Sequence, residues 1–239
     1  MDGSLVGTLF LGFVLGLKHA LDADHLVAVS TIVGRSQSLW KSAWVGVIWG
    51  MGHTASLFVA AMAVILLRVT ISPTMALSME FCVGLMLIVL GADLMRRVMT
   101  GTIAIHSHPH EHDGHAHVHV HVHTAAADHA SHHGVGKRPF IVGLVHGMAG
   151  SAALMLFVLS TIASPWVGLL YVAIFGLGTV GGMLVMSALI GLPFTVASRR
   201  LSGMVGRLQL AVGVGSFAFG IFYTWQVAVG ERLLANLLP

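Results

Sequence analysis

The sequence predicts an all-α, polytopic membrane protein, and three observations lead to that fold class. Of its 239 residues, 56% are hydrophobic and only 9% are Asp, Glu, Lys or Arg, whereas a soluble domain carries about 25% charged residues. The mean hydropathy is +0.89. The apolar residues are also gathered into long runs. Such a chain cannot cover its exterior with polar groups, which excludes a disordered protein and indicates a bilayer as its solvent.

Six apolar runs are long enough to be transmembrane helices, since about 20 apolar residues cross a bilayer. They span residues 5–33, 42–67, 75–98, 139–163, 166–191 and 204–229. Prolines stand at or near the ends of these runs, where the missing N–H group is tolerated. These prolines are Pro73, Pro139, Pro165 and Pro193.

The distribution of Lys and Arg predicts how the six helices are oriented, because cytoplasmic loops hold the excess of these residues. One side of the map carries Arg35, Lys41, Arg96, Arg97, Lys137, Arg138, Arg199, Arg200 and Arg207. The other side carries only Arg68 and Arg232. We therefore expect both termini outside and the loop after the third helix in the cytoplasm. The pI of about 9.5 reflects this topology, and no nucleic-acid partner is expected.

The two halves of the chain share a sequence pattern. Residues 13–19, FVLGLKH, match residues 140–146, FIVGLVH, and residues 48–52, IWGMG, match residues 174–178, IFGLG. Three spans per half is an odd number, so the second copy must be inverted, as in many secondary transporters. The predicted organisation is a 3+3 inverted repeat: residues 1–99, a disordered histidine-rich cytoplasmic loop over 100–138, and residues 139–239.

The two predicted halves differ in their ionisable residues. The positions of Asp22, Asp24 and His25 correspond to Ala149, Ser151 and Ala152, that of His53 to Thr179, and that of Glu80 to Gln209. The first half therefore holds nearly all the ionisable chemistry of the predicted spans.

Histidine is the one abundant polar residue, with 16 copies, and they form two populations. Twelve lie in a low-complexity tract between His106 and His133. Many imidazoles at flexible spacing suit weak metal capture or buffering, so we expect this tract to be disordered without metal. The other four lie inside apolar runs, where polar side chains are costly and usually functional.

Residues 19–25, HALDADH, place two imidazoles and two carboxylates within one predicted helix. At 100° per residue, His19, Asp22 and His25 share an arc of about 120°, with Asp24 roughly 100° further round. Imidazole and carboxylate together suit a divalent first-row ion such as nickel, cobalt or zinc. The candidate metal ligands are His19, Asp22, Asp24, His25 and His53, followed by His146 and Glu80. The ion would be transported cargo, so neither a resident cofactor nor a catalytic residue is expected.

The HALDADH segment matches the H-x4-D-H signature of the nickel/cobalt transporter family. Residues 46–58, GVIWGMGHTASLF, resemble its second motif, and residues 143–154, GLVHGMAGSAAL, with the histidine-rich loop, are most similar to the urease accessory, UreH-like branch. The resemblance implies movement of nickel or cobalt across a bacterial cytoplasmic membrane, with His19, Asp24 and His25 in the signature positions. It also implies delivery to a cytoplasmic nickel chaperone or to urease assembly proteins.

Several alternatives stay open at the level of sequence. The closest is an efflux protein for the same ions, and a zinc permease is another, since ligand type alone does not select the metal. A membrane metallochaperone and a haem-binding membrane protein with axial histidines belong to different classes. The aspartates beside the histidines argue against haem.

Overall fold

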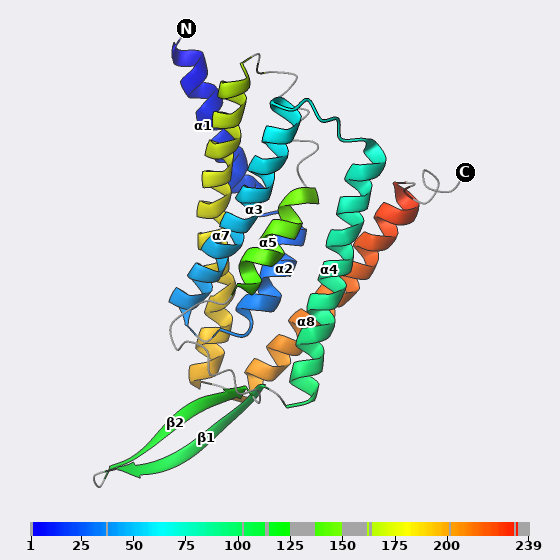
Figure 1. Ribbon diagram of the computed structural model, residues 1–239. Helices are drawn as coiled ribbons and strands as arrows, with labels where there is room; N and C mark the ends of the chain where they lie inside the picture. The colour runs from blue at the N-terminus through cyan, green and yellow to red at the C-terminus, as the bar shows by residue number, and fades with distance from the viewer. Residues whose placement is uncertain are drawn as a thin grey trace.

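A computed structural model describes residues 2–36, 38–101, 103–112, 115–124, 137–149, 162, 164–200, 202–231 and 233. The helices form an elongated bundle, and a two-stranded β-hairpin extends from one end of it (Figure 1). Helix α1 begins at the opposite end, and α8 also finishes toward that end (Figure 1). The described part of the chain is thus helical apart from the hairpin, as the sequence predicts.

The first predicted span is broken in two. Helix α1 covers Asp2–His19 and helix α2 covers Ala23–Val33, and their axes differ by 57°. The expectation of one helix through residues 5–33 is therefore wrong. Asp22, the N-cap of α2, has extended backbone angles, φ −61° and ψ 143°. Aspartate is a preferred N-cap residue, so the chain starts a new helix there.

The next two helices follow the predicted spans closely. Helix α3 covers Leu39–Ile65 and helix α4 covers Pro73–Met99. The hydroxyl of Ser72 caps α4 by accepting a hydrogen bond from the backbone N–H of Met75 at 3.2 Å. Pro73 occupies the first helical position, where its fixed φ suits the helix. The predicted boundaries are confirmed to within a few residues.

Helix α5 covers Arg138–Ala149, helix α7 covers Pro165–Arg200, and helix α8 covers Ser202–Trp225, continued by the π-helix η1 over Gln226–Gly230. Pro139 and Pro165 stand at helix starts as predicted. Pro193 does not mark an end, because α7 runs through it to Arg200. Proline is tolerated inside membrane helices when neighbouring groups satisfy the freed carbonyl.

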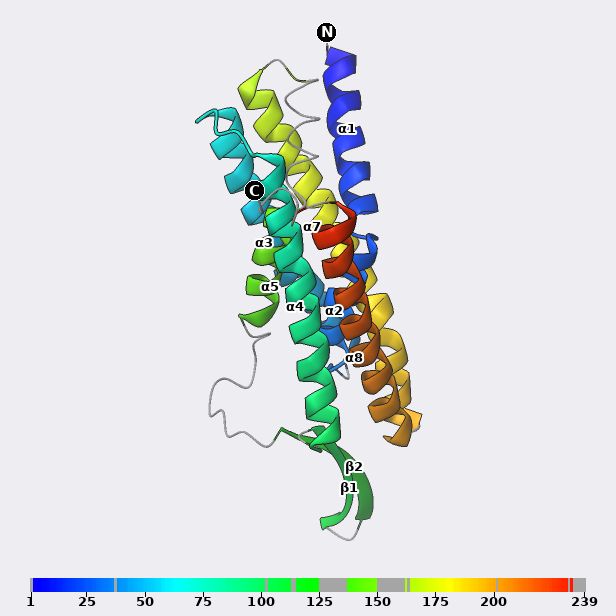
Figure 2. The same ribbon diagram turned by 90° about the vertical axis from the view of Figure 1, so that its right-hand side faces the viewer.

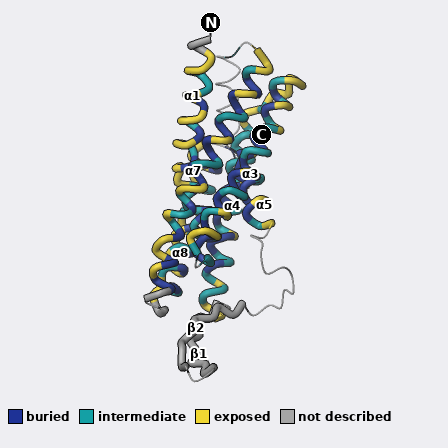
Figure 3. Tube along the Cα trace, turned by 90° about the vertical axis from the view of Figure 1, so that its left-hand side faces the viewer, coloured by how far each residue is buried: buried dark blue, intermediate teal, exposed yellow. Residues whose placement is uncertain are grey.

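The helices carry apolar side chains on their outer faces. Phe10, Val59, Val89 and Leu177 are each more than half exposed, and exposed segments follow the outside of the bundle while buried ones face inward (Figure 3). Among the described residues, four helices are long and apolar enough to span a bilayer, and the bent pair of α1 and α2 makes a fifth if it counts as one span. The predicted span over 139–163 lies partly outside the described residues, so the count of six stays a prediction.

Helices α1 and α7 pack closely because glycines face backbone across the interface. A Cβ atom on Gly16 would meet the carbonyl oxygen of Phe175, and one on Gly178 would meet that of Phe13. No larger residue fits at either position without moving a helix.

Helices α5 and α3 repeat this arrangement with the matching residues of the other half. A Cβ atom on Gly143 would meet the carbonyl oxygen of Trp49, and one on Gly52 would meet that of Phe140. The α3 and α7 helices also lie against each other, and α4 lies along α8 (Figures 1 and 2). The two halves of the chain therefore use equivalent glycines at equivalent interfaces.

The histidine-rich tract contributes the hairpin. Strand β1, Ile103–His112, pairs antiparallel with strand β2, His115–Thr124, with Ile103 opposite Thr124. The alternation of Val and His over 117–123 matches the two-residue period of a strand, and valine favours strands. This local preference for extended backbone differs from the predicted disorder. Residues 113–114 and 125–133 lie outside the described residues, and the behaviour of the loop without metal stays a prediction.

Candidate metal centre

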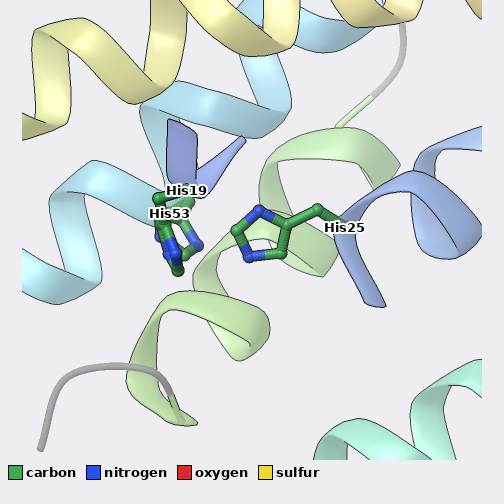
Figure 4. A group of neighbouring side chains, drawn as sticks. All are labelled: His19, His25 and His53. Atoms are coloured by element: carbon green, nitrogen blue, oxygen red, sulfur yellow. The ribbon is translucent and has the colours of Figure 1, made fainter. Parts of the chain in front are cut away.

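Four histidines meet inside the bundle at the break between α1 and α2. His19 is the last residue of α1, His25 lies in the first turn of α2, His53 lies in α3 and His146 lies in α5. His25, His53 and His146 are 1%, 0% and 2% exposed. Figure 4 shows the His25 ring reaching from α2 toward the neighbouring rings of His19 and His53. The four intramembrane histidines of the sequence thus belong to one cluster.

His25 is the centre of this histidine cluster. Its ring centroid lies 4.5 Å from that of His19, 5.0 Å from that of His53 and 4.4 Å from that of His146. The expected arc on a single helix does not exist, because His19 and His25 belong to two helices. The bend brings them together instead.

Two overlapping sets of potential ligands share His25. The first ligand group is His19, His25 and His53, and the second ligand group is Asp24, His25 and His146. Within each group the ligand atoms lie within 4.8 Å of one another. Bonds of about 2.1 Å from an ion to nitrogen keep ligand atoms within about 4.2 Å, so small side-chain movements would close either group on an ion.

Asp22 lies behind His19 and belongs to neither ligand group. Its Oδ2 accepts a hydrogen bond from Nδ1 of His19 at 2.8 Å, and its side chain is 52% exposed. A neutral His19 that donates from Nδ1 keeps a lone pair on Nε2. That atom lies 3.3 Å from Nε2 of His53. Asp22 is thus placed to orient a ligand, as carboxylates do behind metal-bound histidines.

Asp24 is the carboxylate inside the cluster. Its Oδ2 accepts a hydrogen bond from Nε2 of His146 at 2.7 Å, and its Oδ1 accepts one from the backbone N–H of His25 at 3.0 Å. Its position in the first turn of α2 also suits a negative charge, because the helix dipole is positive there. Asp24 is therefore held in place both by α2 and by His146 of the second half of the chain.

Three buried histidine nitrogens have no partner within the described part of the chain. They are the Nδ1 atoms of His25, His53 and His146. Buried polar atoms are nearly always hydrogen-bonded, because leaving one unpaired costs free energy. Imidazole nitrogen is also a good ligand for borderline divalent ions. The cluster therefore has the donor set and the unused lone pairs that a metal ion needs.

Trp49 is a member of the site that sequence reasoning missed. It is fully buried in α3, and its ring stacks on His53 at 5.2 Å with an interplanar angle of 13°. It also lies 4.9 Å from the ring of His25 and 5.3 Å from that of His146. Its spacing of four residues before His53 on one helical face is the signal that could have found it. The buried indole thus lies against three of the four imidazoles.

The remaining candidates lie outside the two ligand groups. Glu80 is half-buried in α4 and belongs to neither group. Outside the candidate ligands, Asp93 of α4 accepts hydrogen bonds at 2.8 Å from Arg35 and from Arg138. Arg97 donates to it at 3.0 Å. Asp93 thus joins the ends of α2 and α4 to the start of α5.

Comparison with known proteins places this arrangement in a family. The chain is 41% identical to the urease accessory protein UreH of Bacillus sp. (strain TB-90) over 232 residues, which cover 96% of this chain and 95% of that protein. A shorter stretch of 68 residues is 31% identical to the high-affinity nickel transport protein of Cupriavidus necator, covering 28% of this chain and 19% of that one. No family model and no solved structure matches the chain. The extent of the first match shows that this multi-pass membrane protein belongs to the UreH family of urease accessory proteins.

Proposed function

We propose that the chain is a permease for divalent nickel, with cobalt as a second cargo. The observation that carries this proposal is the set of three buried, unpartnered imidazole nitrogens at the centre of an apolar bundle. Polar groups at membrane depth are costly, and where they cluster they mark substrate pathways. Ions held this way exchange their hydration shell for protein ligands.

The two relatives support nickel as the cargo. One is named a high-affinity nickel transport protein and the other a urease accessory protein. The first name supports nickel as the ion, and the second supports urease assembly as its destination. The ligands proposed to hold the ion are His19, Asp24, His25, His53 and His146, with Asp22 orienting His19. Their chemistry suits nickel and cobalt.

Equivalent packing in the two halves supports a six-span, 3+3 inverted repeat over residues 1–99 and 139–239. Beyond the pairs of α1 with α7 and α5 with α3, the α4 and α8 helices meet at matching glycines. A Cβ atom on Gly91 would meet Gly213, and one on Gly220 would meet Gly84. Transporters built from such repeats bind their substrates near the midplane, beside broken helices.

The excess of Lys and Arg on the side of the hairpin supports a cytoplasmic position for residues 100–138 and an external position for both termini. In this orientation an ion leaving the cluster meets the histidine-rich tract. The tract would buffer nickel and pass it to a cytoplasmic chaperone or to urease assembly proteins. The membrane is then the bacterial cytoplasmic membrane.

Reconstitution into liposomes with a metal-sensitive dye inside tests the proposal. Nickel should enter vesicles containing the wild-type protein, and a panel of divalent ions measures selectivity among nickel, cobalt and zinc. The variant His25→Gln should reduce the flux by at least about 100-fold, because removing even a supporting group of a metal site costs 10–100-fold. Ser216→Ala is the matched control, since it removes a buried hydroxyl that donates to Leu87 O, outside both ligand groups.

Equal nickel flux in wild type and His25→Gln would overturn the site. Absence of flux for every ion would overturn the permease and favour a metallochaperone. In cells, nickel content that falls on expression would favour efflux over uptake. A Soret band in the purified protein would instead indicate haem.

A further inference from the structure

We propose that the cluster offers the ion two successive positions that share His25, a step that rests on the proposed transport function. The first ligand group and the second ligand group overlap in this one residue. An ion could therefore pass from one group to the other while it keeps the His25 imidazole as a ligand.

The positions of the two ligand groups along the chain give the step a direction. His19 ends α1, which comes from the end of the bundle where the chain begins, and Asp24 begins α2, which continues toward the hairpin (Figure 2). Each group has one partly exposed member, His19 at 21% and Asp24 at 23%, and its other members are buried. The direction of the step therefore follows from the order of the two helices, with the second ligand group past the bend.

The chemistry of the two groups also differs. The first contains three imidazoles, and the second replaces one imidazole with the carboxylate of Asp24. The carboxylate offsets the charge of a cation in a medium of low dielectric. The 2.7 Å hydrogen bond between His146 and Asp24 closes this second position until an ion displaces it. Exchange between sites that hold an ion without trapping it is what conduction requires.

The position of Trp49 supports a single shared ligand. Its ring touches His25, His53 and His146, which come from both groups. It therefore walls both positions and keeps water out between them. If the two positions shared no ligand, a partly dehydrated ion would leave one ligand group before it reached the other. His25 belongs to both groups and stays bound to the ion during the step.

Two paired variants of the full-length chain separate the positions. Asp24→Asn with His146→Gln leaves only the first ligand group, and His19→Gln with His53→Gln leaves only the second. Binding of cobalt(II) to the purified proteins is followed by its ligand-field absorption. A reference variant with His25→Gln, His53→Gln and His146→Gln measures the cobalt bound elsewhere, including by the histidine-rich tract, and this share is subtracted.

Each paired variant should bind one cobalt ion with its own spectrum, and His25→Gln should lose the ion of both positions. Each paired variant should also carry nickel into liposomes at least 10-fold more slowly than wild type, because the second step is missing. The single variants His53→Gln and His146→Gln, one from each ligand group, repeat the test with smaller changes. The thermal unfolding of each variant is compared with that of Ser216→Ala to check that it is folded.

A paired variant that folds and binds no cobalt above the reference would overturn the two positions in favour of one joint site. A paired variant that transports nickel at the wild-type rate would overturn the relay as well. If wild type carries no ion while both paired variants bind cobalt, the transport function fails and the two positions stand.

Discussion

The two halves of the bundle pack alike but differ in chemistry. In α3, Trp49 and His53 line the candidate metal centre, while the matching positions in α7 are Phe175 and Thr179. All four side chains are buried. The hydroxyl of Thr179 donates only to the carbonyl oxygen of Phe175, one turn earlier in its own helix. Close helix packing uses glycines of both halves, whereas the candidate ligands lie mostly in the first half.

The second half nevertheless contributes to the candidate metal centre. His146 comes from α5 and binds Asp24 of the first half, and Phe175 lies 5.4 Å from the ring of His19. The centre therefore lies between the halves although the ligands are unevenly divided between them. Experiments that exchange matching residues can separate the contribution of the scaffold from that of the ligands.

The largest expected effect comes from replacing His53 of the first half with threonine, the residue at the matching position, Thr179, of the second half. His53→Thr removes an imidazole that faces His19 Nε2 at 3.3 Å. Nickel flux into liposomes should fall at least about 100-fold, since the loss of a direct ligand exceeds the 10–100-fold cost of a supporting one. Thermal unfolding in detergent checks that the variant is folded.

The control for this exchange is Thr179→Val, which changes the matching buried residue of the second half. Its flux should stay near the wild-type rate, because Thr179 belongs to neither ligand group. If Thr179→Val lowered the flux as much as His53→Thr, the division between scaffold and ligands would be refuted.

A second pair of variants tests whether the halves pack equivalently. Gly16→Ala and Gly143→Ala each place a methyl group against a backbone carbonyl of the neighbouring helix. Each should destabilise the protein by about 2–3 kcal/mol, the usual cost of overpacking, and the two losses should be similar. The melting temperature in detergent measures both.

Gly7→Ala in the same helix as Gly16 is the matched control, since a Cβ there would have no neighbour within 4 Å. It should be neutral or stabilising by up to about 1 kcal/mol, because alanine favours helices over glycine. Strong destabilisation by Gly16→Ala with no effect of Gly143→Ala would show that the two interfaces are not equivalent.

Hydropathy was sufficient to predict most helices, because the length of an apolar run fixes what can span a bilayer. It could not reveal the break at Asp22. Asp22 and Asp24 are also helix-start signals, as an N-cap and a first-turn acid, but inside an apolar run they were interpreted as ligands on a continuous helix. Asp22 hydrogen-bonds to His19 in the structure, and its role as a direct ligand stays a prediction.

The sequence also could not show which residues from distant parts of the chain contact one another. The sequence marked His25, His53 and His146 as unusual for membrane depth, yet spacing along a helix cannot say which of them meet. Trp49 passed unnoticed because tryptophan is unremarkable in an apolar run, and only packing brings it onto three imidazoles. Arg35 and Arg138 likewise reach Asp93 only through the fold.

A smaller effect is expected from breaking that ionic link between the halves. Asp93→Asn leaves Arg35, Arg97 and Arg138 facing one another without a carboxylate. Stability should fall by about 2 kcal/mol, less than for a fully buried pair because water screens this partly exposed site. Melting temperatures of wild type and variant should differ most at low salt. Arg96→Gln is the control, since its side chain is 74% exposed and 3.8 Å from Asp93; an equal loss there would contradict the link.

The smallest effect is expected from removing residues 106–133, which carry twelve histidines. If the tract only buffers nickel, its loss should lower cellular nickel accumulation a few-fold at limiting nickel and have no effect at saturating nickel. Many weak sites raise the local amount of bound ion without setting the rate of passage through the membrane. Accumulation measured across a range of nickel concentrations separates the two regimes. Complete loss of accumulation at saturating nickel would instead show that the tract is part of the transport path and that the buried cluster alone does not carry the ion.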